Sequence, residues 1–186
     1  IGGGMAHTFD KSKGLPVGNS LVEDDKLELS QELLKEAEAK GVKVVLPLDL
    51  RVANMFPLAD EAKWKAEGKS KIVDVDKVED GWEALDSGPK TSEAYVHALK
   101  GAKTVVWNGP MGVFEMKPFA TGTFAIAEAI ANLDATTVIG GGESASVVDQ
   151  MGIEDKFSHV STGGGASLEM LEGMVLPGVA VLADKE

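Results

Sequence analysis

The stretch 157-FSHVSTGGGASLEMLEG-173 passes from a short β-rich run to an amphipathic segment through Gly163, Gly164 and Gly165. Glycine loses more backbone entropy on folding than other residues, so three in a row indicate a sharp bend or a close approach to the backbone. The segment that follows has the pattern of a helix, whose first turn presents unpaired N–H groups that bind anions. A single triplet is nevertheless more typical of a helix cap or a bulge.

The same arrangement recurs elsewhere in the chain. Glycine-rich segments follow two other apolar runs, with Asn108–Gly112 after 104-TVVW-107 and Gly140–Gly142 after 136-TTVI-139. Ile1–Gly4 is a fourth such segment if residues before Ile1 complete a strand. Helical patterns at 91–103 and 119–133 separate the runs. Strands that alternate with helices of this length predict an α/β fold with a doubly wound, Rossmann-like parallel sheet in three αβα layers.

In such sheets ligands bind at the carboxyl ends of the strands. The glycine-rich segments all follow predicted strands, so we expect them to lie at that edge. Several of them at equivalent places favour a phosphate cradle over unrelated caps, and bare helix N-termini supply the positive potential that a phosphate needs.

The remaining elements are less sharply defined. The pattern predicts a helix over 25–40, a buried strand over 41–47, an extra or edge strand at 72–75, and a final strand or extended tail at 179–182. The residues predicted to share one face of the first helix are Leu27, Leu29, Leu33, Leu34 and Ala37. The stretch 53–78 reads as an irregular surface excursion, and no linker divides the chain, so we expect one domain over 1–186.

Composition narrows the class of protein. The chain has 186 residues, 44% of them hydrophobic, which is enough for one core. It has no cysteine, which excludes disulfides and thiolate metal sites. The formal net charge of −12 argues against nucleic acid as a partner. No apolar run approaches the roughly 20 residues of a membrane span. The chain opens on Ile1 without Met, so we expect it to be truncated or processed.

Motifs for other chemistries are missing. There is neither a GxxxxGK[ST] motif nor a GxGxxG motif with an acidic residue about 20 positions on, so a nicotinamide dehydrogenase on the same fold lacks its signature. His7, His97 and His159 have no metal-binding spacing. Glu143 follows a glycine loop, where it is either a first-turn charge favoured by the helix dipole or a ligand of Mg²⁺. Spacing alone favours the first interpretation.

Taken together, several segments resemble the C-terminal, nucleotide-binding domain of phosphoglycerate kinase. They are 1-IGGGMAHTF-9, 18-GNSLVE-23, 80-DGWEALDSGPKT-91, 105-VVWNGPMGVFE-115, 119-FATGT-123, 139-IGGGESAS-146, 157–173 and 176-LPGV-179. The resemblance implies a kinase that moves a phosphoryl group between 1,3-bisphosphoglycerate and ADP with Mg²⁺, in glycolysis or carbon fixation. It also implies a protein that is usually monomeric and cytoplasmic, or plastidic in a photosynthetic eukaryote.

The resemblance also implies roles for single residues. Those expected to bind the nucleotide are Gly3, Gly4 and Leu85 about the adenine, Asn108, Pro110, Gly112 and Val113 along the ribose and phosphates, Glu115 on the ribose hydroxyls, and Gly141, Gly142 and Ser144 near the phosphates. Glu143 occupies the metal position, where the family more often has Asp. Gly164 and Gly165 face the transferring phosphoryl group, and a Cβ there is expected to impair transfer more than nucleotide binding.

Some positions depart from the family, and part of the family's domain is not in this sequence. Ala84 stands in place of a usual glycine and Asp10 in place of a usual apolar residue. By the resemblance, the first strand–helix unit of the domain and the whole glycerate-binding domain precede Ile1. We therefore expect 3-phosphoglycerate or 1,3-bisphosphoglycerate to bind through that other domain, and this chain alone not to turn over. The alternative is an isolated nucleotide-binding or folding fragment without a catalytic role.

Overall fold

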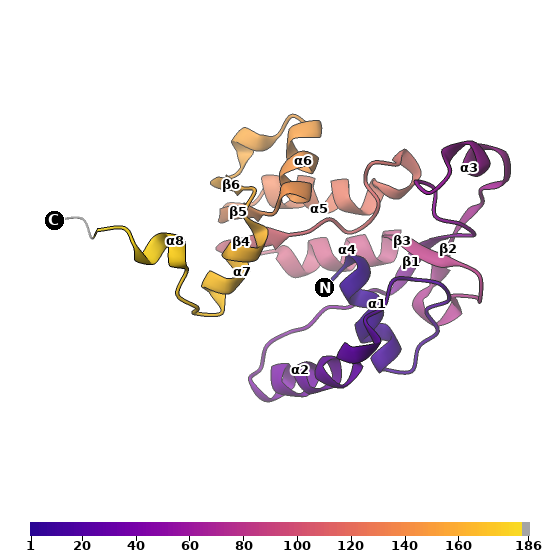
Figure 1. The fold of residues 1–186 in the computed structure, drawn as a ribbon, viewed down its shortest axis with the longest axis horizontal. Coiled ribbons are helices and arrows are strands. Elements are labelled where there is room, and N and C mark those ends of the chain that lie inside the picture. The colour runs from indigo at the N-terminus through magenta and orange to yellow at the C-terminus, as the bar shows by residue number, and fades with distance from the viewer. Residues whose placement is uncertain (184–186) are drawn as a thin grey trace. The chain divides into compact units, whose positions relative to one another are not determined.

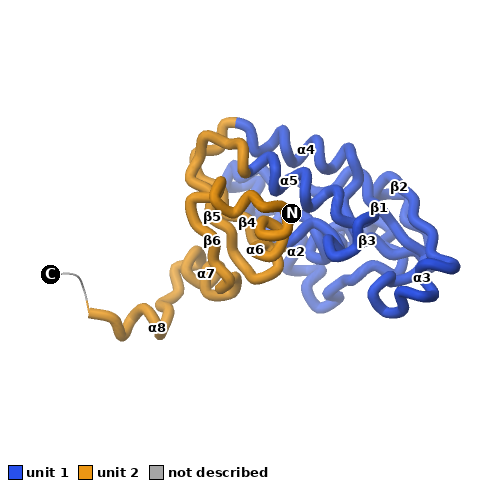
Figure 2. Tube along the Cα trace, turned by 90° about the horizontal axis from the view of Figure 1, so that it is seen from above, with its two compact units in different colours: residues 1–100, 110–130 blue, residues 101–109, 131–186 orange. Residues whose placement is uncertain are grey.

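The computed structural model describes residues 1–183, which form two compact units. Unit 1 comprises residues 1–100 and 110–130, and unit 2 comprises residues 101–109 together with the described residues from 131 onward (Figure 2). The expectation of a single domain over 1–186 stays a prediction, and each unit is described by itself.

Unit 2 contains the predicted parallel sheet. Its strands are β4 (Thr104–Asn108), β5 (Thr136–Gly140) and β6 (His159–Ser161), and its helices are α6 (Gly142–Gln150), α7 (Gly164–Leu171) and α8 (Pro177–Ala180) (Figure 1). The strands lie in the order β4-β5-β6, and both pairings are parallel. Asn108 pairs with Gly140 and Gly140 with Ser161, so the three strands end level with one another. The predicted α/β class with a parallel sheet is confirmed.

Unit 1 contains a second sheet that the sequence did not predict. Its elements are α1 (Gly3–Ser12), α2 (Leu27–Ala39), β1 (Asp49–Ala53), α3 (Glu61–Glu67), β2 (Ser70–Asp74), β3 (Glu83–Ser87), α4 (Pro89–Leu99) and most of α5 (Thr121–Ala131). The strands lie in the order β2-β1-β3 with antiparallel pairing. The central β1 is almost wholly buried, whereas β2 alternates between exposed and half-buried residues as an edge strand does. The predicted edge strand at 72–75 is therefore confirmed for 72–74, which lie in β2, whereas Val75 begins a 3-10 turn.

The predicted buried strand over 41–47 is wrong. Residues 42–47 belong to no strand, and the strand begins two residues later at Asp49. A strand forms where its backbone finds partners in a neighbouring strand, and β2 and β3 provide them for 49–53. The backbone bonds of 42–47 go to helical or terminal residues instead: the Val42 N–H donates to the Ala37 carbonyl of α2, and the Ile1 ammonium donates to the Val45 carbonyl, both at 2.8 Å.

Three other expectations also fail in part. Val179 and Ala180 lie in the short helix α8 rather than in a strand, because Pro177 presets a helical φ at its first turn. The supposed irregular stretch 53–78 holds α3, capped by the Asp60 carboxylate that accepts from the Lys63 N–H at 2.9 Å, as well as β2. On α2, Leu29 and Leu33 are 46% and 44% exposed, so its buried face is narrower than the sequence predicted.

A buried polar cluster fastens α4 to β1 in unit 1. The Asp49 carboxylate accepts from the backbone N–H of Thr91 at 2.8 Å and of Lys90 at 3.2 Å, which satisfies the first turn of α4. The Thr91 hydroxyl lies within hydrogen-bond distance of two oxygens of Asp49, the backbone carbonyl at 2.6 Å and the carboxylate at 2.8 Å. Beside this cluster, β1 and β3 share an apolar core of Leu50, Val52, Val78 and Ala84. These bonds fix the start of α4 against β1.

Candidate functional site

The glycine loops of unit 2 meet around the side chain of Asn108. Its Oδ1 would lie 2.9 Å from a Cβ placed on Gly140, 3.1 Å from one on Gly141 and 2.6 Å from one on Gly164. Three glycines from two different loops therefore pack against one amide because none of them has a side chain. Gly141 also has a φ of +90°, a conformation that residues with a Cβ rarely adopt.

The N-termini of α6 and α7 lie side by side at this edge of the sheet. A Cβ on Gly164 would be 2.9 Å from the Cα of Gly141, and these residues stand at the starts of α7 and α6. Neither helix has a side-chain N-cap. The Gly164 N–H donates to the Thr162 carbonyl at 3.2 Å, and the other N–H groups of both first turns are available to a ligand. The positive ends of two helix dipoles thus converge, which suits an anion without any lysine or arginine. The predicted glycines Gly141, Gly142, Gly164 and Gly165 are brought together here.

Ser144 has a structural contact that sequence reasoning did not reveal. It is fully buried in the first turns of α6, and its hydroxyl accepts from the backbone N–H of Gly109 at 2.7 Å. Ser144 therefore ties the loop after β4 to α6. Its expected place beside a phosphate stays a prediction.

Replacing Ser144 by Ala is expected to lower the free energy of unfolding by about 1–3 kcal/mol, because the Gly109 N–H loses its acceptor. Ser146, exposed on the same helix, provides the matched control Ser146→Ala, for which we expect a change below about 0.5 kcal/mol. Urea unfolding measures both. Equal effects of the two substitutions would show that the Ser144 contact does not stabilise the fold.

Glu143 lies exposed in the first turn of α6. A Cβ on the neighbouring Gly142 would meet no atom within 4 Å, so the space beside it is open. Among residues 1–183 no group of three or more His, Cys, Asp or Glu side chains is arranged to hold a metal. A carboxylate at an anion site fits a Mg²⁺ that takes its other ligands from phosphate oxygens and water.

In unit 1, the predicted residues Gly3, Gly4 and Pro110 are close to one another along the start of α1. Gly3 has a φ of +62°, and a Cβ on it would lie 3.0 Å from the Pro110 carbonyl oxygen. A Cβ on Gly4 would lie 3.0 Å from the side chain of Leu21. The backbone of this helix start is thus held tightly from two sides.

The other predicted residues of unit 1 lie around β3 and the loop that carries Gly112. The side chain of Leu85 is buried in a cluster with Ala53 and Phe119, and its carbonyl accepts from the Val113 N–H at 2.9 Å. Glu115 is exposed. The predicted site residues therefore form two sets, one in each unit.

Sequence reasoning missed two buried polar residues of unit 1, Asp86 and Thr123. The Thr123 hydroxyl accepts from the backbone N–H groups of Met111 and Gly112, at 3.0 and 3.1 Å. The Asp86 carboxylate accepts from the Gly122 N–H at 2.8 Å. A charged residue beside the apolar pair Ala84 and Leu85 must find partners when it is buried, and Asp86 in 83-EALDS-87 was such a signal in the sequence.

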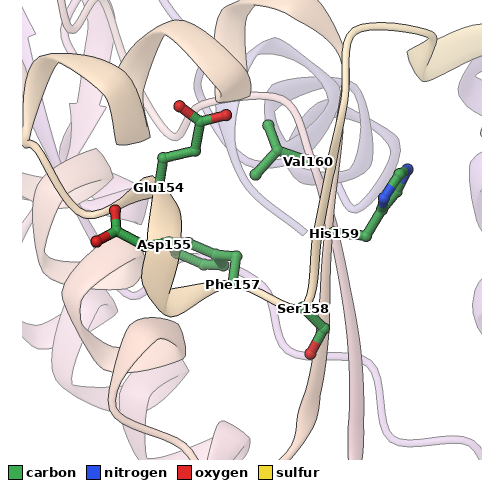
Figure 3. Close-up of a pocket in the computed structure, with 6 residues that line it drawn as sticks. All are labelled: Glu154, Asp155, Phe157, Ser158, His159 and Val160. Carbon is green, nitrogen blue, oxygen red and sulfur yellow. The ribbon is translucent and has the colours of Figure 1, made fainter.

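A separate hollow of about 400 Å³ lies at the start of β6, away from the glycine loop that follows its end. It is lined by Glu154, Asp155, Phe157, Ser158, His159 and Val160, and none of these is a predicted site residue. Figure 3 shows the carboxylates of Glu154 and Asp155 on one side and the His159 ring turned away from them.

Comparisons with known proteins bear on both units. The family model for phosphoglycerate kinase matches residues 1–174. A phosphoglycerate kinase of Moorella thermoacetica is 55% identical over 185 residues, and one of Chloroflexus aurantiacus is 52% identical over 189. Each alignment covers 100% of this chain and 45% of the relative, so the chain spans less than half of their length.

Solved structures give the same result. The match to phosphoglycerate kinase from Coxiella burnetii covers 97% of this chain and 44% of the Coxiella chain, with a TM-score of 0.87 at 39% identity. The enzyme from Pyrococcus horikoshii matches 96% and 43%, with a TM-score of 0.75 at 30% identity. Across residues 1–183, no helix is long and apolar enough to cross a membrane.

Proposed function

This chain belongs to the phosphoglycerate kinase family, and we propose that it is the nucleotide-binding portion of such a kinase, which holds ADP or ATP with Mg²⁺. The phosphoryl group would pass between this nucleotide and 1,3-bisphosphoglycerate. The observation that carries the proposal is the pair of uncapped helix N-termini at Gly141 and Gly164. Two such ends attract the charge of a phosphate chain at the edge where parallel sheets bind ligands.

We assign the phosphate end of the nucleotide to unit 2. Gly141 and Gly142 at the start of α6, together with Asn108, would bind the phosphates, and Glu143 would hold Mg²⁺, which neutralises phosphate charge when bound. Gly164 and Gly165 would face the transferring group: Gly165 would donate its backbone N–H, and Gly164, whose N–H bonds to the Thr162 carbonyl, would leave room for the phosphoryl oxygens because it has no Cβ. Phosphoryl transfer demands positioning and charge stabilisation more than covalent help, which backbone donors can provide.

We assign the nucleoside end to unit 1. The residues proposed to contact adenine and ribose are Gly3, Gly4, Leu85, Pro110, Gly112, Val113 and Glu115. The exposed Glu115 carboxylate is available to accept from the ribose hydroxyls. The Leu85 side chain is buried, and its carbonyl holds the loop that carries Val113.

The proposal extends to the setting of the whole enzyme. A chain that spans 45% of its relatives is proposed to rely on the remainder of a kinase for the phosphoglycerate. We place the reaction in glycolysis or carbon fixation, in the cytoplasm or a plastid, with a monomeric enzyme. In a coupled assay, the 186-residue chain alone is expected to give no turnover above background, and normal activity would contradict this part of the proposal.

Calorimetric titration with Mg-ADP tests the nucleotide assignment. We expect saturable binding that weakens when EDTA removes Mg²⁺, because the metal screens the phosphate charge in this acidic chain. NADH is the comparison ligand, since a nicotinamide dehydrogenase is the alternative on such a fold. Absence of heat with millimolar Mg-ADP from a chain that is folded by circular dichroism would refute the assignment, and NADH quenching of tryptophan fluorescence would favour the alternative.

A further inference from the structure

The loop 110–113 of unit 1 is held to β3 and α5 by backbone hydrogen bonds, and the Val113 side chain packs against the Leu85 cluster. The Val113 N–H bonds to the Leu85 carbonyl, and the N–H groups of Met111 and Gly112 both bond to the Thr123 hydroxyl. A Cβ on Gly112 would lie 2.7 Å from the Cα of Asp86, so the loop rests directly on β3. The position of the loop is therefore set by β3 on one side and by the first turn of α5 on the other.

Asp86 connects these two supports. It lies on β3, is 3% exposed, and its two carboxylate oxygens accept from the Ser87 N–H at 2.9 Å and the Gly122 N–H at 2.8 Å. Gly122 belongs to the first turn of α5, where a carboxylate also interacts well with the helix dipole. A Cβ on Gly122 would lie 2.5 Å from the same carboxylate, so the two elements are in direct contact.

We propose that Asp86 is a positioning residue for nucleotide binding: its carboxylate fixes the first turn of α5, and through the Thr123 hydroxyl this turn fixes the loop 110–113. The inference rests on the proposed function, because that loop carries Pro110, Gly112 and Val113. Thr123 is fully buried, and its hydroxyl accepts both loop N–H groups. A turn that shifts by a fraction of an ångström would carry the loop with it.

The charge of Asp86 gives this arrangement a dependence on pH. Burial raises the pKa of the carboxyl to about 7, against smaller opposing effects of the Gly122 and Ser87 N–H groups and of Arg51, its partner across the β1–β3 ladder. Protonation turns one acceptor oxygen into a donor and weakens the bond to Gly122. We therefore expect Mg-ADP affinity to fall as the pH drops from 8 to 6.

Stability should move the other way. The unfolded chain loses this proton near pH 4 and the folded chain near pH 7, so the folded state binds more protons in between. The contribution of Asp86 to stability is thus greatest below pH 4 and is lost as the pH rises to 7. If Asp86 had only a structural role, affinity for Mg-ADP and stability would fall together over the same pH range. We expect them to diverge, because protonation of Asp86 at low pH weakens Mg-ADP binding but favours the folded state.

The test is a titration of the 186-residue chain with Mg-ADP between pH 6 and pH 8, compared with Asp86→Asn. We expect Asp86→Asn to bind about tenfold more weakly than the unsubstituted chain at pH 8, the effect of losing one charged hydrogen bond, and to match it at pH 6. The exposed Asp80→Asn is the matched control and should keep the original profile, which removes the titration of ADP itself from the comparison.

A second pair of variants covers the case in which Asp86→Asn does not fold. Thr123→Val removes the acceptor for the loop with little change in volume, and should weaken binding about tenfold at every pH. Thr123→Ser keeps the hydroxyl and should retain the Mg-ADP affinity of the unsubstituted chain. Identical affinity and pH profile for the unsubstituted chain, Asp86→Asn and Thr123→Val would overturn the inference. Failure of the unsubstituted chain to bind Mg-ADP at any pH would instead refute the proposed function.

Discussion

Replacing Gly164 by Ala is expected to lower the affinity for Mg-ADP at least tenfold and the free energy of unfolding by about 1–3 kcal/mol. The added Cβ would lie 2.6 Å from the Asn108 Oδ1 and 2.9 Å from the Gly141 Cα. The amide can rotate away, but the Gly141 backbone begins α6 and cannot yield without moving that helix. The two helix N-termini would separate, and the anion site would lose its convergent donors. Calorimetry and urea unfolding measure the two effects.

Gly165→Ala is the matched comparison, since a Cβ at Gly165 would meet no atom within 4 Å. We expect its unfolding free energy to stay within about 0.5 kcal/mol of the unsubstituted chain. Any loss of Mg-ADP affinity in Gly165→Ala then reflects contact with the ligand and not a change in the fold. In a whole kinase with this substitution, phosphoryl transfer should fall more than nucleotide affinity, because the Cβ stands where backbone donors approach the phosphoryl oxygens. Equal losses of transfer and affinity would contradict that role.

Replacing Asp10 by Asn is expected to stabilise the chain by about 1–3 kcal/mol at pH 8 and to change little at pH 4. Asp10 lies on α1 with 1% of its surface exposed, and neither carboxylate oxygen receives a hydrogen bond from a described residue. Burial raises its pKa to about 6, although the nearby Lys13 acts in the opposite direction. A buried charge without hydrogen-bond partners is costly, and Asn removes the charge while it keeps the shape.

The pH dependence follows from the direction of this shift. Between about pH 4 and pH 6 the folded chain keeps a proton that the unfolded chain has lost, so the Asp10 contribution to stability falls as the pH rises through this window. His7 has the opposite effect on the pH dependence of stability, because burial lowers its pKa to about 4. This effect is present in both Asp10→Asn and the unsubstituted chain, so it cancels in their difference. Asp149→Asn, on the exposed face of α6, is the helical control. If the difference between Asp10→Asn and this control is constant from pH 4 to pH 8, the Asp10 charge is not what destabilises the fold.

Several parts of the fold follow from local sequence pattern. The strands β4 and β5 of unit 2 are short β-branched and apolar runs, all three strands are followed by glycines, and helical patterns lie between them. Such patterns depend on neighbours within a few residues, so the parallel sheet and the glycine loops at its carboxyl edge were predicted correctly. The apolar run 42–46 had the same pattern and still failed, because a strand also requires partners that the pattern does not name.

The sequence alone was sufficient to predict an anion site, from the glycines at 141 and 164 and from the family resemblance. Backbone N–H groups at a helix start bind an anion without any particular side chain. Only the tertiary structure decided that Asn108 lies across both loops, that Ser144 bonds Gly109, and that Asp86 supports the loop 110–113 through α5. These contacts join residues 24 to 56 positions apart, whether by one bond or through α5. The packing of strands and helices determines which of these residues meet, and the local periodicity of the sequence contains no information about that packing.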